Sequence, residues 1–281
     1  MPSSTQPLEN AGTILDSPQD AIVFEDVRLS FESNLVLDGV SFSLARGETK
    51  AIFGVSGTGK STILKLAMGL LKPDSGRIFV LGSEVTAMKE EELFALRRKL
   101  GMVFQESALF DSLTVEENVA FRLMEEHVPY EEIHQRVLEV LRFVELEHTV
   151  NLFPSELSGG MRRRVAIARA IITQPEVLLY DSPTGGLDPV TSTTIVELLV
   201  KQRDVYKTSA LLVTHRLQDA FIMATHAFNS AANKMEPLPP GMHRNLHTNF
   251  IVLKDAKIIF RGNAAELVHS DNEYIREYLS Q

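Results

Sequence analysis

The feature that most constrains this chain is the segment Gly54-Val55-Ser56-Gly57-Thr58-Gly59-Lys60-Ser61, which matches the pattern G-x-x-x-x-G-K-[ST]. An apolar stretch of strand length, TKAIF, precedes it, and the residues that follow, KSTILKLAMGLL, have helical periodicity. A glycine-rich loop between a strand and a helix is a unit from which parallel α/β sheets are built. The segment therefore predicts an α/β fold.

The same loop predicts a binding site for phosphate. Its glycines allow the backbone to wrap around an anion with several N–H groups pointing inward, and the positive end of the following helix adds to the field. Lys60 would reach the β- and γ-phosphates of a nucleotide, and the hydroxyl of Ser61 would bind Mg²⁺. The next residue, Thr62, is expected to contact the nucleotide as well. The alternative is a plain turn between a strand and a helix.

A second ligand for Mg²⁺ is predicted at the end of another strand. The segment VLLYD, residues 177–181, is an apolar strand that ends in the carboxylate of Asp181. In nucleotide-binding folds of this kind such an aspartate lies beside the serine of the loop and helps to hold the ion. Strands that end in aspartate are common, so this inference depends on the pairing with Ser61.

Strand and helix patterns divide the chain into parts. Residues 1–20 are polar and are expected to form a flexible tail, whereas residues 21–270 are expected to form one domain. Short strands at the start of this domain predict an antiparallel β region. Residues 106–163 contain amphipathic helices without a strand and predict a helical insertion. Short apolar strands that alternate with helices elsewhere predict a mainly parallel sheet covered on both faces.

The C-terminal part is predicted in three pieces. The pattern of residues 216–228 favours a helix, and residues 228–248, rich in Pro, Asn and Gly, predict a surface loop. Two strands follow, and residues 271–281 predict a C-terminal helix. His243 and His247, with His226 nearby, could bind Zn²⁺ only if they lay on a helix, so a solvated loop is expected instead.

Composition excludes several classes of function. The net charge is −9 and the pI about 5.4, whereas a surface that binds duplex nucleic acid normally carries a basic excess, so no nucleic-acid partner is expected. The absence of cysteine excludes disulfides and thiolate metal sites. No apolar run reaches 18 residues, and the N-terminal residues lack the pattern of a secretion signal.

A second glycine motif narrows the family. Leu157-Ser158-Gly159-Gly160-Met161 resembles the signature of ABC ATPases. The resemblance implies an ABC ATPase fold: a P-loop core, an N-terminal antiparallel β region and an inserted helical subdomain. It also implies that Ser158, Gly159 and Gly160 of one subunit face the γ-phosphate held by the other, so that ATP and Mg²⁺ lie between two chains. A serine N-cap on an ordinary helix is the alternative.

Other residues occur in the order of that family. By resemblance, Gln105 contacts Mg²⁺ and links the two subdomains, and Asp188, in Gly186-Leu187-Asp188, lies in a loop that crosses the dimer interface. His215 resembles the histidine that contacts the γ-phosphate, and Phe31 the aromatic residue that stacks on adenine. The alternatives are a structural histidine at a strand end and an ordinary apolar phenylalanine.

A narrower resemblance is carried by SALFDSLTVEENVAF and PSELSGGMRRRVAIARAI, which are similar to strings in the ATPases of Mce/Mla-type lipid transporters. It implies transport of phospholipid or a related lipid. The implied partners are a second ATPase subunit, giving a homodimer, an integral-membrane permease and an Mce-type lipid-binding protein. The implied location is the cytoplasmic face of the inner membrane, where the subunit is peripheral. Residues 108–110 would form the groove that receives the permease, unless they are core.

One position departs from the family pattern. The residue after Asp181 is usually a glutamate that orients or deprotonates the attacking water, but here it is Ser182, which cannot act as a base near neutral pH. ATP could then serve chiefly to hold the dimer together, His215 and Gln105 could orient the water, or the chain could pair with an intact ATPase. We expect slow hydrolysis in a homodimer.

Two rival functions and one further feature remain. The first rival is a soluble ATP-dependent switch, although such proteins usually carry two ATPase units or a long coiled coil. The second is a small-molecule kinase, which would leave residues 157–161 unexplained. Separately, residues 162–164, all arginine, could meet acidic lipid, but a solvated helix face with one buried salt bridge is expected.

Overall fold

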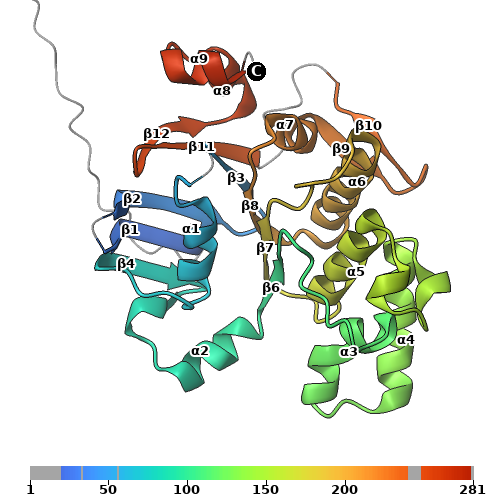
Figure 1. Cartoon of the computed structure of the whole chain (residues 1–281). Coiled ribbons are helices and arrows are strands. Elements are labelled where there is room, and N and C mark those ends of the chain that lie inside the picture. Colours follow the sequence, from blue (N-terminus) through green and yellow to red (C-terminus); the bar gives the residue numbers. More distant parts are fainter. Residues whose placement is uncertain (1–19, 33, 56, 240–247, 280–281) are drawn as a thin grey trace, which may run out of the picture.

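A computed structural model describes residues 20–32, 34–55, 57–239 and 248–279 of the chain (Figure 1). The expected tail therefore lies almost wholly outside the described residues, as do Ser56, His243 and His247. Within the described residues, no helix is both long enough and apolar enough to cross a membrane.

A six-stranded sheet forms the centre of the molecule, in the order β12-β11-β3-β8-β7-β6. Neighbouring strands from β11 to β6 are parallel, whereas β12 pairs with β11 in the antiparallel direction. The predicted mainly parallel sheet is thereby confirmed. The strands are β3 (Thr49–Phe53), β6 (Leu100–Val103), β7 (Val177–Asp181), β8 (Ser209–Val213), β11 (Thr248–Lys254) and β12 (Lys257–Gly262).

Both faces of this sheet are buried, which explains why its strands are continuous apolar runs. In β3, Ala51 and Phe53 belong to one hydrophobic core, whereas Ile52 belongs to the core on the opposite face. Helices cover these faces as shown in Figure 1. Those of the α/β part are α1 (Lys60–Ala67), α2 (Glu90–Arg97), α6 (Pro189–Tyr206), α7 (Leu217–Thr225), α8 (Ala264–Val268) and α9 (Glu273–Leu279).

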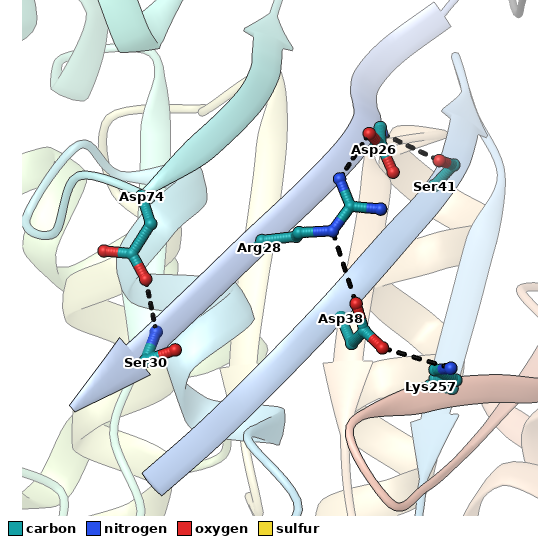
Figure 2. Close-up of polar contacts among 7 residues, drawn as sticks. All are labelled: Asp26, Arg28, Ser30, Asp38, Ser41, Asp74 and Lys257. Carbon is teal, nitrogen blue, oxygen red and sulfur yellow. Dashed lines mark hydrogen bonds and ion pairs between the residues drawn. The ribbon is translucent and has the colours of Figure 1, made fainter. Parts of the chain in front are cut away.

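A smaller sheet with the order β2-β1-β4-β5 is antiparallel throughout and forms where the sequence predicts an antiparallel β region. Its strands are β1 (Asp20–Phe31), β2 (Asn34–Ala45), β4 (Ser75–Val80) and β5 (Ser83–Glu84). Figure 2 shows two ion pairs of Asp38 on β2: Oδ1 lies 3.3 Å from Nε of Arg28 on β1 of the same sheet, and Oδ2 lies 3.1 Å from Nζ of Lys257 on β12 of the central sheet. The hydrogen bond from Lys257 is the main cause that holds the pKa of the Asp38 carboxyl below its ordinary value, and Arg28 adds to the effect.

The helical insertion contains α3 (Val115–Glu125), α4 (Tyr130–Phe143) and the start of α5 (Gly159–Ile171). Thr114 and Glu117 form a capping box that starts α3. The fully buried amide of Asn118 donates to the carbonyls of Phe110, Leu113 and Thr114 and accepts from the Phe110 N–H. This amide fixes the loop that leads from β6 into the helices.

The predicted helix over residues 216–228 is wrong at its end, because α7 stops at Thr225. The next residues form a hairpin of β9 (His226–Asn229) and β10 (Lys234–Pro237), within a segment predicted as a loop. Side chains of α6 turn the backbone: the buried guanidinium of Arg203 donates to the His226 carbonyl at 2.8 Å, and Asp204 accepts from the Phe228 N–H at 2.7 Å. Local periodicity cannot reveal these tertiary contacts.

Candidate functional site

The loop after β3 needs glycine at two positions. The φ angles of Gly54 and Gly59 are 153° and 85°, and both residues approach neighbouring atoms closely. A Cβ at Gly54 would lie 2.5 Å from the Leu253 carbonyl oxygen, and one at Gly59 would lie 2.8 Å from Cγ1 of Val36. The pattern therefore reflects the space around the loop as well as its curvature.

Lys60 points its ammonium group back at this loop. Its Nζ donates to the carbonyls of Gly54 at 2.8 Å and Val55 at 2.7 Å. Burial lowers the pKa of this amine, and the charge of Asp181 opposes the shift. Among the described residues, no carboxylate comes within 4.0 Å of Nζ, so a buried cation is held by carbonyls and its charge remains available to an anion.

The N-terminus of α1 is open. Its N-cap is Gly59, which has no side chain to accept a hydrogen bond, and its first turn contains no acidic residue. The first N–H groups of a helix lack partners within the helix, and the helix dipole makes that end positive. The loop, Lys60 and this helix end thus fit a phosphate group.

Two of the three predicted ligands of Mg²⁺, Ser61 and Asp181, lie side by side. The Ser61 hydroxyl donates to Oδ1 of Asp181 at 2.9 Å, although 120 residues separate them in sequence. A hydroxyl and a carboxylate are the hard oxygen donors that Mg²⁺ prefers, and this ion usually takes only one or two protein ligands beside phosphate and water. These residues therefore fit Mg²⁺.

The predicted residues of several segments meet at one cavity of about 420 Å³. Phe31 lies at the end of β1 with 47% of its surface exposed, so a face of the ring is free for stacking. The structure thus brings most of the predicted site together within one chain. The lining residues are Phe31, Val36, Gly57, Gly59, Lys60, Ser61, Thr62, Gln105, Ser182, Val213 and His215.

Ser182 is buried at the wall of this cavity, with a φ angle of 46°. Its N–H donates to the Val213 carbonyl at 2.7 Å, and its carbonyl accepts from the Gly185 N–H at 2.9 Å. Among the described residues, none that lines the cavity carries a carboxylate. Asp219, a buried carboxyl close in sequence to His215, is hydrogen-bonded by Thr184, and burial raises its pKa.

The second motif does not line this cavity. The hydroxyl of Ser158 caps α5 by accepting from the Met161 N–H at 3.2 Å. Asp188 caps α6 in the same way, and its hydrogen bonds, that from Thr191 first, lower its pKa. A Cβ at Gly160 would collide with Cγ2 of Thr191, so the N-termini of α5 and α6 lie in close contact.

Sequence reasoning missed the role of the arginines on α5. Arg163 is buried, with desolvation lowering its pKa, and it donates to the carbonyls of Phe104, Ser182 and Gly185. Arg169 donates to Ser107 at 2.8 Å and Ala108 at 2.7 Å. These two side chains tie α5 to the segments that follow β6 and β7.

The expected arginine face is correct in part: Arg162 is exposed and Arg164 partly exposed, but the buried Arg163 has carbonyls as its partners where a salt bridge was expected. Arg162 and Arg164 also donate to carbonyls, those of Leu157 and Val144. A signal was available in the sequence: Arg163 shares its helix face with Ile167 and Ala170, at spacings of four and seven residues. A cation on an apolar stripe is buried with its own polar partners.

A second, more apolar cavity of about 360 Å³ is lined in part by Arg169. Phe104, Ala108, Phe110 and Phe121 contribute to its wall, and the Phe110 and Phe121 rings lie 4.7 Å apart. Leu109 packs against the core instead. Residues 108–110 are therefore divided between the predicted groove and the alternative of core packing.

No group of three or more His, Cys, Asp or Glu residues suited to a metal occurs in the described residues. Nδ1 of His226 lies 2.9 Å from the Thr225 hydroxyl. A zinc site with His243 and His247 involves residues that the structure does not describe.

Comparisons with known proteins identify the family. A family model described as "ABC transporter" matches residues 37–185. The chain is 38% identical to protein trigalactosyldiacylglycerol 3, chloroplastic, of Arabidopsis thaliana over 275 residues, 94% of this chain and 75% of that protein. It is 42% identical to methionine import ATP-binding protein MetN 2 of Bacillus cereus over 200 residues, 70% of this chain, and spans 59% of that relative.

Two solved structures are similar across most of the chain. One is a dimeric post-hydrolysis state of the ATP-binding cassette MJ0796 bound to ADP and Pi, with a TM-score of 0.72, 30% identity and coverage of 86% of this chain and 98% of that one. The other is cbiO1 from Clostridium perfringens, part of the complex cbiONQ, with a TM-score of 0.74, 28% identity and coverage of 94% and 96%.

Proposed function

This chain belongs to the ABC transporter family, and from that premise we propose that it binds Mg-ATP in the cavity between Phe31 and His215 and powers a membrane transporter. The observation that carries the proposal is the convergence of Lys60, Ser61 and His215 from separate segments on one cavity. The fold, with its parallel core, antiparallel sheet and helical insertion, is the ABC ATPase fold.

Each group of the site has a role in binding. Phe31 stacks on adenine, while the N–H groups of residues 54–61 and the ammonium of Lys60 surround the phosphates. Ser61, Asp181 and Gln105 hold Mg²⁺, and when bound this ion neutralises charge that develops on the transferred phosphoryl group. His215 contacts the γ-phosphate from the end of β8.

A second copy of the chain completes the site. Ser158, Gly159 and Gly160 do not line the cavity of their own chain, so in our proposal they contact the γ-phosphate held by a partner. Asp188 lies beside them at the start of α6 and would cross the same interface. The dimeric state of the MJ0796 cassette with ADP and Pi supports this arrangement. ATP closes the dimer, and hydrolysis reopens it.

Hydrolysis is slow in this proposal, because Ser182 takes the place of the glutamate. Among the described residues that line the cavity none has a carboxylate, and the adjacent Asp181 is assigned to Mg²⁺, so in this proposal Gln105 and His215 orient the water. A general base contributes about 10²–10⁴-fold in rate. Pairing with an intact ATPase, or ATP acting only to hold the dimer closed, are the alternatives.

The proposed cargo is phospholipid or a related lipid. Similarity to trigalactosyldiacylglycerol 3, a protein named after a lipid, extends over 94% of this chain, whereas the methionine importers match over 64–70% of it. Methionine is the second candidate. An integral-membrane permease would insert into the cavity beside Phe104 and Phe110, an Mce-type lipid-binding protein would complete the assembly, and the subunit would lie at the cytoplasmic face of the inner membrane.

Two measurements test the proposal. Equilibrium dialysis should detect binding of Mg-ATP, and sedimentation velocity should detect a monomer that dimerises only when both ATP and Mg²⁺ are present. Failure to bind Mg-ATP would overturn the function. Isolation of the tagged chain from native membranes should then recover a permease with bound lipid. Recovery of methionine instead of lipid would identify methionine as the cargo. A chain found only in the soluble fraction would favour a soluble ATP-dependent switch.

A further inference from the structure

His215 occupies a short connection, in which Nε of the neighbouring Arg216 lies 3.5 Å from Oδ1 of Asp219. It lies between β8 (Ser209–Val213) and α7 (Leu217–Thr225), and it lines the phosphate cavity. The Thr214 hydroxyl accepts from the Arg216 N–H at 3.0 Å, and the Thr214 N–H donates to the Ile52 carbonyl at 3.2 Å. These contacts hold the residues on either side of His215.

The carbonyl of His215 itself is held by the far end of the chain. The hydroxyl of Tyr278, on α9, donates to this oxygen at 3.1 Å across 63 residues of sequence. The half-buried phenol has a pKa raised above its ordinary value, first by burial and then by the neighbouring Tyr274, so it remains a protonated donor at neutral pH.

The helix that carries this hydroxyl is anchored to the body of the protein. Ile275 is buried, and the rings of Tyr274 and Tyr278 stack with centroids 6.1 Å apart. Nζ of Lys254, at the end of β11, lies 4.4 Å from the centroid of the Tyr274 ring. Figure 1 shows α9 next to α8 at the end of the molecule where β11 and β12 lie. The Tyr278 hydroxyl therefore acts from a fixed support.

We propose that Tyr278 is a positioning residue for the reaction: through its hydrogen bond to the His215 carbonyl, the C-terminal helix sets where the imidazole stands in the phosphate cavity. The inference rests on the proposed function. The position of the His215 imidazole matters for hydrolysis because the residue after Asp181 is a serine, so placement of the attacking water depends more heavily on His215 and Gln105. A backbone carbonyl held on one side limits the rotation of its residue.

The helix supplies its own control. The hydroxyl of Tyr274 is buried and has no hydrogen-bond partner among the described residues, whereas that of Tyr278 has the His215 carbonyl. Tyr278→Phe and Tyr274→Phe each remove one oxygen and keep the stacked ring. In the purified full chain, Tyr278→Phe should lower kcat by about 3- to 10-fold, the effect of one hydrogen bond, with KM for ATP unchanged. Tyr274→Phe should leave both constants unchanged.

A measurement without nucleotide separates this inference from the proposed function. Hydrogen exchange of the peptide containing residues 213–217 should be several-fold faster in Tyr278→Phe than in Tyr274→Phe. Equal exchange in the two variants would overturn the inference, whatever the ATPase activity. Faster exchange with an unchanged kcat would also overturn it, because the contact would then be purely structural.

A double variant completes the test. In a His215→Ala background, Tyr278→Phe should cause no further loss of kcat, since the two changes act through one residue. Independent losses that multiply would contradict a role through His215. Failure of the wild-type chain to bind Mg-ATP would instead refute the proposed function and leave the exchange result to decide whether Tyr278 restrains His215.

Discussion

The two helix N-termini that we propose contact phosphate, those of α1 and α5, are built in opposite ways. α1 begins after Gly59, with no side-chain cap, and Lys60 and the loop surround its end within a cavity. α5 begins after Ser158, whose hydroxyl already accepts from the Met161 N–H, and its first residues line no part of that cavity. The end of α1 has no side-chain cap and lies at the cavity, whereas the end of α5 is capped and does not line it.

This difference indicates which end can bind alone. In our proposal, the first N–H groups of α1, which no side chain caps, and the buried Lys60 cation stabilise an anion within a single chain. At α5 the serine satisfies part of the helix end, so its contribution to a phosphate needs a ligand delivered by another molecule. In our proposal the two ends are halves of one site, and substitutions in each half should show whether it behaves as its construction indicates.

The largest effect is expected at the group missing from the α1 half. Ser182→Glu should raise the ATPase rate by about 100-fold or more, because a carboxylate would then lie beside the attacking water. Steady-state phosphate release measures this rate. Ser182→Gln, which has the same shape without the base, should stay near wild type. An unchanged rate in Ser182→Glu would contradict the idea that the missing carboxylate limits hydrolysis, and would mean that another group already acts on the attacking water.

Removing the cation of the α1 half should have the next largest effect. Lys60→Ala should weaken Mg-ATP binding on the order of 100-fold, because hydrogen bonds from a charged donor to the phosphates are lost. Isothermal titration calorimetry measures the affinity. Lys65→Ala, on the exposed side of the same helix, should bind ATP normally. Comparable weakening in both variants would show that charge in general, and not this contact, governs affinity.

The glycines of the α5 half separate folding from association. A Cβ at Gly159 would meet Leu187 at an ordinary 3.6 Å, so Gly159→Ala should keep the melting temperature and Mg-ATP binding but weaken ATP-dependent dimerisation by about 10-fold or more. Gly160→Ala should destabilise the monomer itself by about 1–3 kcal/mol through the clash with Thr191. Sedimentation and thermal denaturation distinguish them. Normal dimerisation of Gly159→Ala would contradict the two-chain site.

The smallest effect on folding stability is expected at the cap of α5. Ser158→Ala should lower the stability by about 1 kcal/mol, because the Met161 N–H loses its acceptor. Ser158→Asp should restore the cap, yet its charge would repel the γ-phosphate and prevent ATP-dependent association. Chemical denaturation and sedimentation provide the two readouts. If Ser158→Asp dimerised with ATP as the wild type does, this helix end would not contact phosphate.

Short motifs whose geometry depends on neighbouring residues were predictable from the sequence. The glycine loop implied the strand before it and the helix after it, and the apolar runs that end at Asp181 and His215 implied parallel strands whose ends meet at one edge. That chemistry depends on residues close in sequence or on a shared sheet edge. The geometry of most of the α1 half followed from these patterns.

What remained hidden depends on contacts between distant segments. The hairpin after Thr225 exists because Arg203 and Asp204 of α6 bind its backbone, and nothing in the local pattern reveals those partners. The carbonyls held by Arg163 were unpredictable for the same reason. Such interactions link a side chain to main-chain atoms, which have no identity in the sequence.

Two arginines of α5 connect this helix to the segments that follow β6 and β7. From Ser158 to Arg169 the helix rises about 17 Å, and the guanidinium of Arg169 donates to the carbonyls of Ser107 and Ala108. Arg163, about midway between Ser158 and Arg169, donates to the carbonyls of Phe104 and Ser182. One helix thus connects the serine motif with the wall of the apolar cavity, and we expect a displacement of its serine end on dimer closure to reach that wall through these hydrogen bonds.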